Sequence, residues 1–469
     1  MTIVASAILL FLGVAIVVIM LYQYLRGTVE LLSLRNFFLL GFLVFVISSG
    51  VLSLWYEDSG NYPVNDWGRL GMIYAILSVL FIILFLSIYR AGFGMVRLAS
   101  AFKMRTVQPG ATAMLTLSVA FVIAGGVLLL GVQVPYLGII AIQVGSAFLA
   151  IAVALASWVW TPRLFNPVVA MVAVSVILTA LLMLFMYSGF GRRDMMGLGA
   201  AFAWGAYFGH WRYLAFRKLF LRFTVVGTLA AMLLALVTTT RYMHGAEVVS
   251  AQQKIANLSE GSMSEGLYSL ATGQGVGGYS MYFIETRPRS VGYNPLHSLQ
   301  LFFALPIPRA IWPGKPDALG ITSVKEIRAV GKPENWNIGP GLIGHIWNDF
   351  PYVALPLYAL LFALFFRFAD ELIIRNITNP FVVIPMGASL GQLIAVPRGE
   401  LGNFSAKMVA YMLGAWVAMQ LVGRFVGMFT GSGSIFADQG SEADEWADDW
   451  DEWYDDVADE EYVEDAEPI

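Results

Sequence analysis

The feature that most constrains this chain is a series of uninterrupted apolar runs, each about 20 residues long. A helix of that length crosses the hydrocarbon core of a bilayer, which is about 30 Å thick. Charged residues make up only 13% of the chain, against about 25% in soluble domains. The composition excludes a soluble enzyme and a nucleic-acid-binding domain, and the continuity of the runs excludes a transmembrane β-barrel. We therefore expect an all-α polytopic membrane protein.

Hydropathy predicts about eleven transmembrane helices and one long external loop. The first apolar run has no basic segment before it and no small-residue cleavage site after it, so we expect a retained helix. The predicted spans lie near residues 3–22, 37–55, 70–89, 111–132, 139–160, 168–187, 195–210, 223–240, 351–366, 380–397 and 408–427.

The short loops differ in their content of Lys and Arg. One set of alternate loops carries 14 basic residues and the opposite set carries 5. Because basic loops stay in the cytoplasm, we expect the N-terminus outside and the C-terminus inside.

The chain then divides into four parts. Residues 1–240 hold the first eight helices, 241–350 form the long external loop, 351–430 hold the last three helices, and 431–469 form a tail. Loops of that length are usually functional, and we expect surface or re-entrant helices in it.

The tail is expected to be a disordered cytoplasmic extension. From Asp438 onward it carries 16 of the 32 acidic residues and no Lys or Arg. The rest of the chain therefore has a formal charge of 28 − 16 = +12, which favours an anionic partner for it.

Basic residues also occur on the predicted outer face, where they are normally scarce. Arg192 and Arg193 lie in one short outer turn, and Arg398 lies in another. They either extend to lipid phosphates or form an anion site, since guanidinium groups bind phosphate oxygens in a bidentate way.

A dense motif in the long loop, LPIPRAIWPGKPDALG at 305–320, holds Arg309 and Lys315 between four prolines. It is either a rigid loop or a preorganised diphosphate-binding clamp, and we favour the clamp. Arg287 and Arg289 are further candidates for substrate binding.

Three acid–base candidates accompany these cations. His345 and Asp349 are four residues apart, so the carboxylate could orient the imidazole as a general base. Glu400 is the second candidate, but we expect neighbouring Arg398 to favour its ionised, less basic form. His345 is therefore preferred, and His297 is a third candidate.

Other chemistry is not indicated by the sequence. The Gly-rich stretch 272–278 lacks the Gly-Lys-Ser/Thr ending of a phosphate-binding loop, and no D-x-D pair occurs before the tail. The chain has no cysteine and no H-x-x-x-H spacing. We expect no metal and no cofactor.

With these residues in view, the chain resembles the bacterial oligosaccharide repeat unit polymerases, the Wzy-type O-antigen and exopolysaccharide polymerases. The resemblance rests on PIPRAIWPGKP at 306–316 and GPGLIGHIWNDF at 339–350, with RGE at 398–400 and GRRD at 191–194 in support. His345 departs from the pattern, since many relatives would carry an acidic residue there. The acidic tail lies outside the pattern.

The resemblance implies a fold of the membrane glycosyltransferase class, shared with O-antigen ligases and cell-wall polymerases, in the bacterial inner membrane. It implies transfer of a growing glycan from polyprenyl diphosphate to the hydroxyl of a lipid-linked repeat unit, without metal. Flippase and chain-length regulator proteins would be partners. An O-antigen ligase and a lipid-linked oligosaccharide flippase are the alternatives.

Overall fold

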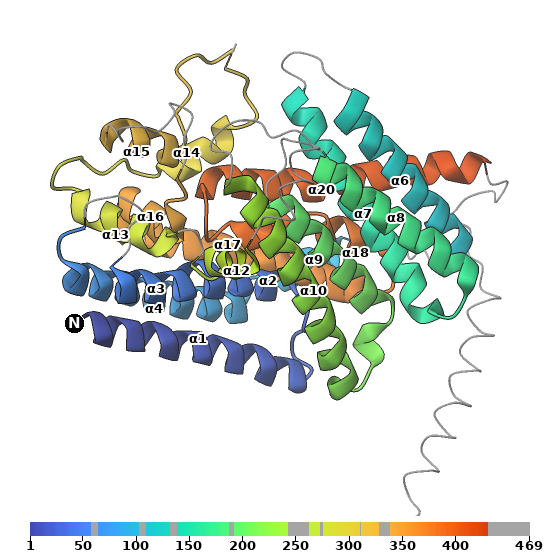
Figure 1. Cartoon of the computed structure of the whole chain (residues 1–469), viewed down its shortest axis with the longest axis horizontal. Coiled ribbons are helices and arrows are strands. Elements are labelled where there is room, and N and C mark those ends of the chain that lie inside the picture. The colour runs from blue at the N-terminus through green and yellow to red at the C-terminus, as the bar shows by residue number, and fades with distance from the viewer. Residues whose placement is uncertain are drawn as a thin grey trace, which may run out of the picture.

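The structure, a computed structural model, is helical in every regular element of the residues that it describes (Figure 1). The tail and the first part of the polar helix expected at 249–270 lie outside those residues. The described ranges are 1–57, 64–102, 109–131, 138–186, 192–242, 262–272, 275–309, 311–327 and 338–429.

Nine helical segments within these ranges are long and apolar enough to cross a bilayer, so the chain is a polytopic membrane protein. They coincide with nine of the predicted spans. The segments are Thr2–Leu25 (α1), Leu34–Tyr56 (α2, Leu34–Phe42; the π-helical turn η1, Leu43–Ser48; α3, Ser49–Tyr56), Trp67–Ala91 (α4), Ala111–Gly131 (α6), Gly138–Trp160 (α7), Pro167–Met186 (α8), Phe216–Tyr242 (α10), Pro351–Arg375 (α17) and Leu401–Phe429 (α20).

The other two predicted spans are helical but differ from a full apolar crossing. Helix α9, Arg192–Gly209, begins with two arginines and an aspartate, which lower its apolar character. The span expected at 380–397 is broken into α18, Pro380–Gly387, and α19, Leu390–Ala395. The described chain therefore has nine long spans where eleven were predicted.

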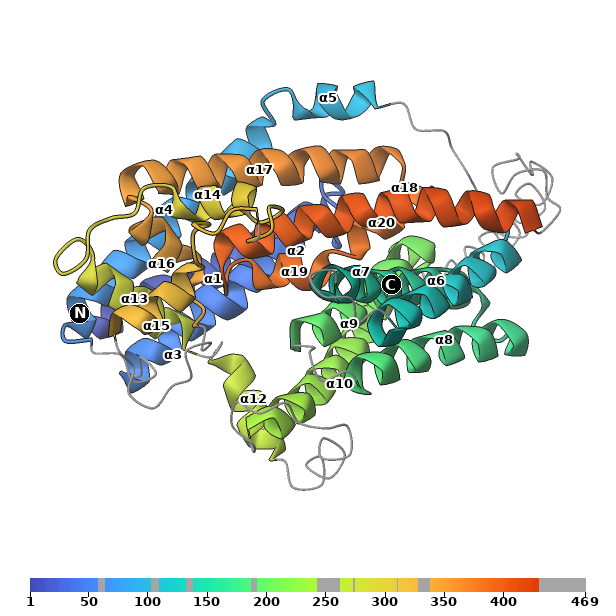
Figure 2. The same cartoon turned by 90° about the horizontal axis from the view of Figure 1, so that it is seen from above.

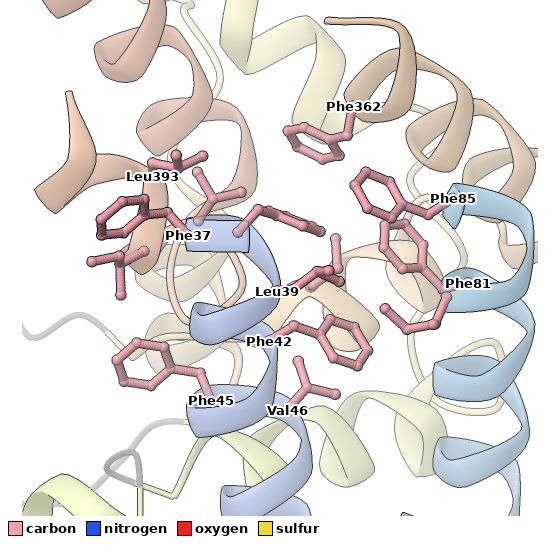
Figure 3. Packing of buried hydrophobic residues seen from close by; sticks show 14 of the residues in the cluster. Phe37, Leu39, Phe42, Phe45, Val46, Phe81, Phe85, Phe362 and Leu393 are labelled. Atoms are coloured by element: carbon pink, nitrogen blue, oxygen red, sulfur yellow. The ribbon is translucent and has the colours of Figure 1, made fainter. Parts of the chain in front are cut away.

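Aromatic side chains of α2, α4 and α17 fill the centre of the first core (Figure 3). The ring of Phe38 lies 5.3 Å from that of Phe362 and 5.1 Å from that of Phe85, between centroids. Gly41 lets α2 approach the backbone of α19, because a Cβ atom there would lie 2.3 Å from the carbonyl oxygen of Ile394. Small residues allow such close helix packing inside a membrane.

A second core joins α6, α7, α8, α9 and α20. Here Gly205 of α9 lies against the backbone of α7, since a Cβ atom would be 2.0 Å from the carbonyl oxygen of Ala154. Because α18 contributes Phe381 and Ile384 to this core and α19 contributes Leu393 to the first, the broken pair α18–α19 links the two.

The long segment between α10 and α17 contains five described helices. One of them, α13, packs against α3 through Gly277, whose N–H donates to Ser49 Oγ at 2.9 Å. Gly277 therefore serves the close packing of α13 on α3, which are neighbours in Figure 2. The five are Met263–Ala271 (α12), Val276–Thr286 (α13), His297–Ala304 (α14), Leu319–Ile327 (α15) and Gly341–Asn348 (α16).

The opposite end of the bundle is fixed by Asp370, in the last turns of α17. That helix continues beyond the predicted end at residue 366. The carboxylate accepts hydrogen bonds from the N–H groups of Leu34 and Arg35, at 2.7 and 3.3 Å, and from Tyr89 Oη at 2.9 Å. Asp370 thereby caps the N-terminus of α2 and ties three helices together.

Candidate functional site

Two of the sequence motifs meet directly. The N–H of Leu342, at the start of α16, donates to the carbonyl of Pro397 at 2.9 Å. Gly341 has φ +72°, a conformation that glycine adopts without strain. Gly339 lies against the carbonyl of Arg398, where a Cβ atom would come within 2.7 Å of the oxygen. The segments 339–350 and 396–401 therefore form one packed unit.

Glu400 connects this unit to the proline-rich motif. Its Oε1 accepts a hydrogen bond from the N–H of Gly320, at 2.7 Å, in the first turn of α15. The side chain is 2% exposed, and Oε2 is buried without a hydrogen-bond partner among the described residues. A buried carboxylate oxygen without a hydrogen bond costs free energy, so we expect a structural or functional reason for it.

Burial raises the pKa of Glu400 to about 8, although the amide groups at the start of α15 oppose the shift. This corrects the expectation that Arg398 would keep Glu400 strongly ionised. Loss of hydration dominates, because the ionised carboxylate depends on solvent, and the nearby charge of Asp349 raises the pKa further. A pKa of about 8 suits proton transfer near neutral pH.

His345 is fully buried, in the middle of α16. The N–H of Leu401 donates to its Nε2 at 3.2 Å, so the ring proton is placed on Nδ1, which donates to Ser298 Oγ at 2.8 Å. Burial, with His297 nearby, lowers the pKa of His345 to about 3. Both ring nitrogens are therefore engaged, and the ring is neutral at ordinary pH. Nε2 lies 3.6 Å from Glu400 Oε1.

Asp349 is joined to His345 through a third residue. Ser298 donates its N–H to Asp349 Oδ2 at 2.8 Å, and its hydroxyl contacts His345. Asn348 Nδ2 and Tyr358 Oη also donate to Asp349. Burial raises the pKa of Asp349, and these donors oppose the shift. Ser298 thus links the side chains of the predicted pair, between which the described part of the chain shows no direct hydrogen bond.

The side chains of Arg287 and His297 are also buried, near these hydrogen bonds. Arg287 Nε donates to Asn348 Oδ1 at 2.7 Å, and its guanidinium lies 5.1 Å from the centroid of the Phe283 ring. His297 Nε2 is 3.0 Å from the carbonyl oxygen of Asp317. Both side chains hold neighbouring segments in place. Arg289 is exposed.

The predicted clamp residues Arg309 and Lys315 are engaged within their own loop. Arg309 pairs with Asp317 at 2.6 Å, and Lys315 Nζ donates to the carbonyls of Leu305 and Ile307 at 2.8 and 3.0 Å. The structure brings Arg309 and Lys315 together, and their contacts stabilise the conformation of the loop. Burial and the charge of Arg309 lower the pKa of Lys315.

Two arginines lie near the bend between α19 and α20, each over an aromatic ring. The guanidinium of Arg193, from α9, is 4.9 Å from the centroid of the Phe404 ring. Arg193 Nε is buried without a hydrogen-bond partner among the described residues, and Asp194 Oδ2 is 3.9 Å away. The guanidinium of Arg398 is 5.7 Å from the centroid of the Phe45 ring in η1.

Phe404 joins Arg193 to the segment that carries Glu400. The same ring packs against Gly399, where a Cβ atom would come within 1.9 Å of it, and Gly399 precedes Glu400. Two helices, α9 and α20, begin here. The N–H of Leu401 is bonded to His345, but helix N-termini also carry partial positive charge, which favours an anion near the bend between α19 and α20. Arg192 begins α9, but its side chain is outside the described residues.

Four functional neighbours were missed in the sequence: Ser298, Asn348, Tyr358 and Lys407. The first three are ordinary polar residues whose role appears only when distant segments meet. Lys407 could have been found in the sequence, because it is a cation near the start of an apolar run. In the structure it lies close enough to Arg193 and Asp194 to interact with both charges.

Within the described residues, no group of three or more His, Asp or Glu side chains could hold a metal ion. The arrangement offers a buried proton acceptor and two arginines near one bend. Comparisons of the chain with models of protein families, with curated proteins and with solved structures find no match.

Proposed function

We propose that this protein is a membrane polymerase of lipid-linked glycan repeat units. The observation that carries the proposal is Glu400, a buried carboxylate whose Oε2 has no hydrogen-bond partner among the described residues, at the bend that also carries Arg398 and where Arg193 packs on Phe404. Transfer of a glycan from a lipid diphosphate needs these two elements: a proton acceptor for the attacking hydroxyl and positive charge for the leaving diphosphate.

In the proposed reaction, the hydroxyl oxygen of the acceptor sugar forms a bond to the anomeric carbon of the donor. The bond between that carbon and the diphosphate oxygen breaks, and polyprenyl diphosphate leaves. Glu400, in its ionised form, accepts the hydroxyl proton on Oε2. His345 and Ser298 act as positioning residues, since they hold the segment that carries Glu400.

Arg193 and Arg398 stabilise the negative charge of the leaving diphosphate, with the N-termini of α9 and α20. The first turn of α15 covers Glu400 through Gly320. The acceptor sugar therefore reaches the carboxylate only when α15 and the proline-rich loop before it move aside. Arg309 and Lys315 keep that loop folded as it moves.

From the basic loops we propose an orientation with the N-terminus outside and the tail in the cytoplasm, and with the bend between α19 and α20 near the outer face of a bacterial inner membrane. The reaction needs no divalent metal, because guanidinium groups and helix N-termini neutralise the diphosphate. An O-antigen ligase remains the second candidate, because the same cations and carboxylate would serve a donor of this kind with a different acceptor.

Reconstituted enzyme tests the proposal. Protein in vesicles is given repeat units linked to polyprenyl diphosphate, with a metal chelator present, and both polymer length and released polyprenyl diphosphate are measured. Polymer formation supports the proposal, and Glu400→Gln should abolish it while Glu285→Gln, a carboxylate paired with Asn65, should not. Polymer that appears only with added magnesium or manganese would contradict the metal-free mechanism.

Deletion in the native host separates the alternatives. Glycan limited to single repeats supports a polymerase, free lipid-linked polymer points to a ligase, and loss of all external repeats points to a flippase.

A further inference from the structure

An unusual turn follows α4 at the end of the bundle that contains Asp370. Gly92, Phe93 and Gly94 have φ angles of +68°, +33° and +82°. Two of these positions suit glycine, but a phenylalanine in this region is strained. The strained turn presents the Phe93 side chain outward, and it is 63% exposed.

The short helix after this turn, α5 (Met95–Ala101), extends the same surface. It packs against α17, where the ring of Phe102 lies 5.5 Å from that of Phe368, between centroids. Its Leu98 side chain remains 46% exposed. Phe93 and Leu98 thus form a small apolar surface that the described part of the chain leaves uncovered.

Two arginines flank this surface. Arg90 and Arg97 are exposed, and neither has an ion-pair partner within the described ranges. By contrast, Arg367 and Arg375 at this end both pair with Glu371, at 3.3 and 2.9 Å. The surface therefore combines exposed apolar groups with unneutralised positive charge.

The tail of the same chain has the complementary composition. Residues 438–469 carry 16 acidic residues and no Lys or Arg. Trp446, Trp450 and Trp453 are spaced by four and three residues, the spacing of one helix face. The tail thus offers aromatic groups between acidic ones, and the turn offers apolar groups between basic ones.

The tail is also long enough to reach this surface. Helix α20 ends at Phe429, and Met419 in its second half packs in the same core as Met114 and Leu117 at the start of α6. Helix α6 is the next long helix after α5 along the chain (Figure 2). Forty residues follow Phe429, and at about 3.3 Å per residue they can span more than 100 Å.

We propose that the acidic, tryptophan-bearing tail of this chain docks on the surface formed by Arg90, Phe93, Arg97 and Leu98. The tail is tethered to the same bundle, so its effective concentration is in the millimolar range, on the order of what a weak electrostatic contact needs. The contact neutralises both arginines and covers Phe93. This inference does not depend on the proposed enzymatic function.

The absence of cysteine from the chain allows a direct test with the full-length protein. Leu98→Cys and Ala447→Cys are introduced together, the protein is placed in vesicles of uncharged phosphatidylcholine, and a mild oxidant is added. The measured quantity is the intramolecular disulfide, by mass spectrometry. The matched control pair is Tyr213→Cys with Ala447→Cys, since Tyr213 is exposed on another loop at the same end.

We expect the intramolecular disulfide to form about tenfold faster with Leu98→Cys than with Tyr213→Cys. Arg90→Glu with Arg97→Glu should slow it about five- to tenfold at low salt, while Arg217→Glu with Lys218→Glu, an equal change of charge elsewhere at this end, should not. Equal rates at the two positions would overturn the proposal.

Two further results would also overturn it. A disulfide that forms only between two molecules, seen when the single-cysteine proteins are mixed, would make a second copy the occupant. The cysteine of the Leu98→Cys variant can also be labelled with a thiol reagent. If vesicles of anionic lipid protect it and the tail does not, lipid headgroups are the occupant.

Discussion

Two buried carboxylates at opposite ends of the molecule show different uses of the same group. Both oxygens of Asp370 accept hydrogen bonds, from Leu34, Arg35 and Tyr89. Glu400 is as deeply buried, but only Oε1 is bonded and Oε2 has no partner among the described residues. A satisfied carboxylate fixes helices, whereas an unsatisfied one with a raised pKa is available for proton transfer. The comparison predicts that the first supports stability and the second supports activity.

The largest expected effect is on activity, at Glu400. Glu400→Gln keeps the size of the side chain but removes the proton acceptor, so the polymerisation rate should fall about 10²- to 10⁴-fold. The thermal midpoint should change little, because the amide can still accept from Gly320. Reconstituted enzyme with lipid-linked repeats provides the rate. A variant that retains near-normal rate would remove Glu400 from the mechanism.

Asp370 should show the reverse pattern. Asp370→Ala leaves the N–H groups of α2 and the hydroxyl of Tyr89 unbonded and the buried Arg35 uncompensated, so unfolding free energy should fall by about 3–5 kcal/mol. Denaturant titration in detergent measures it. Glu371→Ala, a partly exposed neighbour paired with Arg367 and Arg375, should cost less than about 1 kcal/mol. Equal losses in the two variants would contradict the structural role of Asp370.

Activity should depend on the shape of the side chain at position 193, even when its charge is kept. Arg193→Lys keeps the charge but loses the planar group that lies over Phe404 and binds phosphate oxygens in a bidentate way, so kcat should fall about tenfold. Arg69→Lys, at an exposed position at the start of α4, is the matched control and should leave kcat unchanged. Full activity of Arg193→Lys would indicate that Arg193 acts only as a point charge or not at all.

The sequence predicted the membrane class and most of the helices, because apolar runs report directly on bilayer crossing. It also marked the segments 305–320, 339–350 and 398–400, which pack together. It could not rank the acid–base residues. The burial of His345 depends on Ser298 and Leu401, which come from distant segments. The raised pKa of Glu400 likewise comes from burial, whereas the sequence showed only its neighbour Arg398.

The most direct test of the account is the dependence of kcat/KM on pH in the wild-type enzyme. Burial raises the pKa of Glu400 to about 8, so the carboxyl group is mostly protonated at neutral pH and becomes a competent base as pH rises. We expect kcat/KM to increase about tenfold per pH unit from pH 6 and to level off near pH 8. A profile that is flat across this range, or that levels off at about 6.5 as an ordinary histidine would, would contradict the assignment of Glu400 as the base.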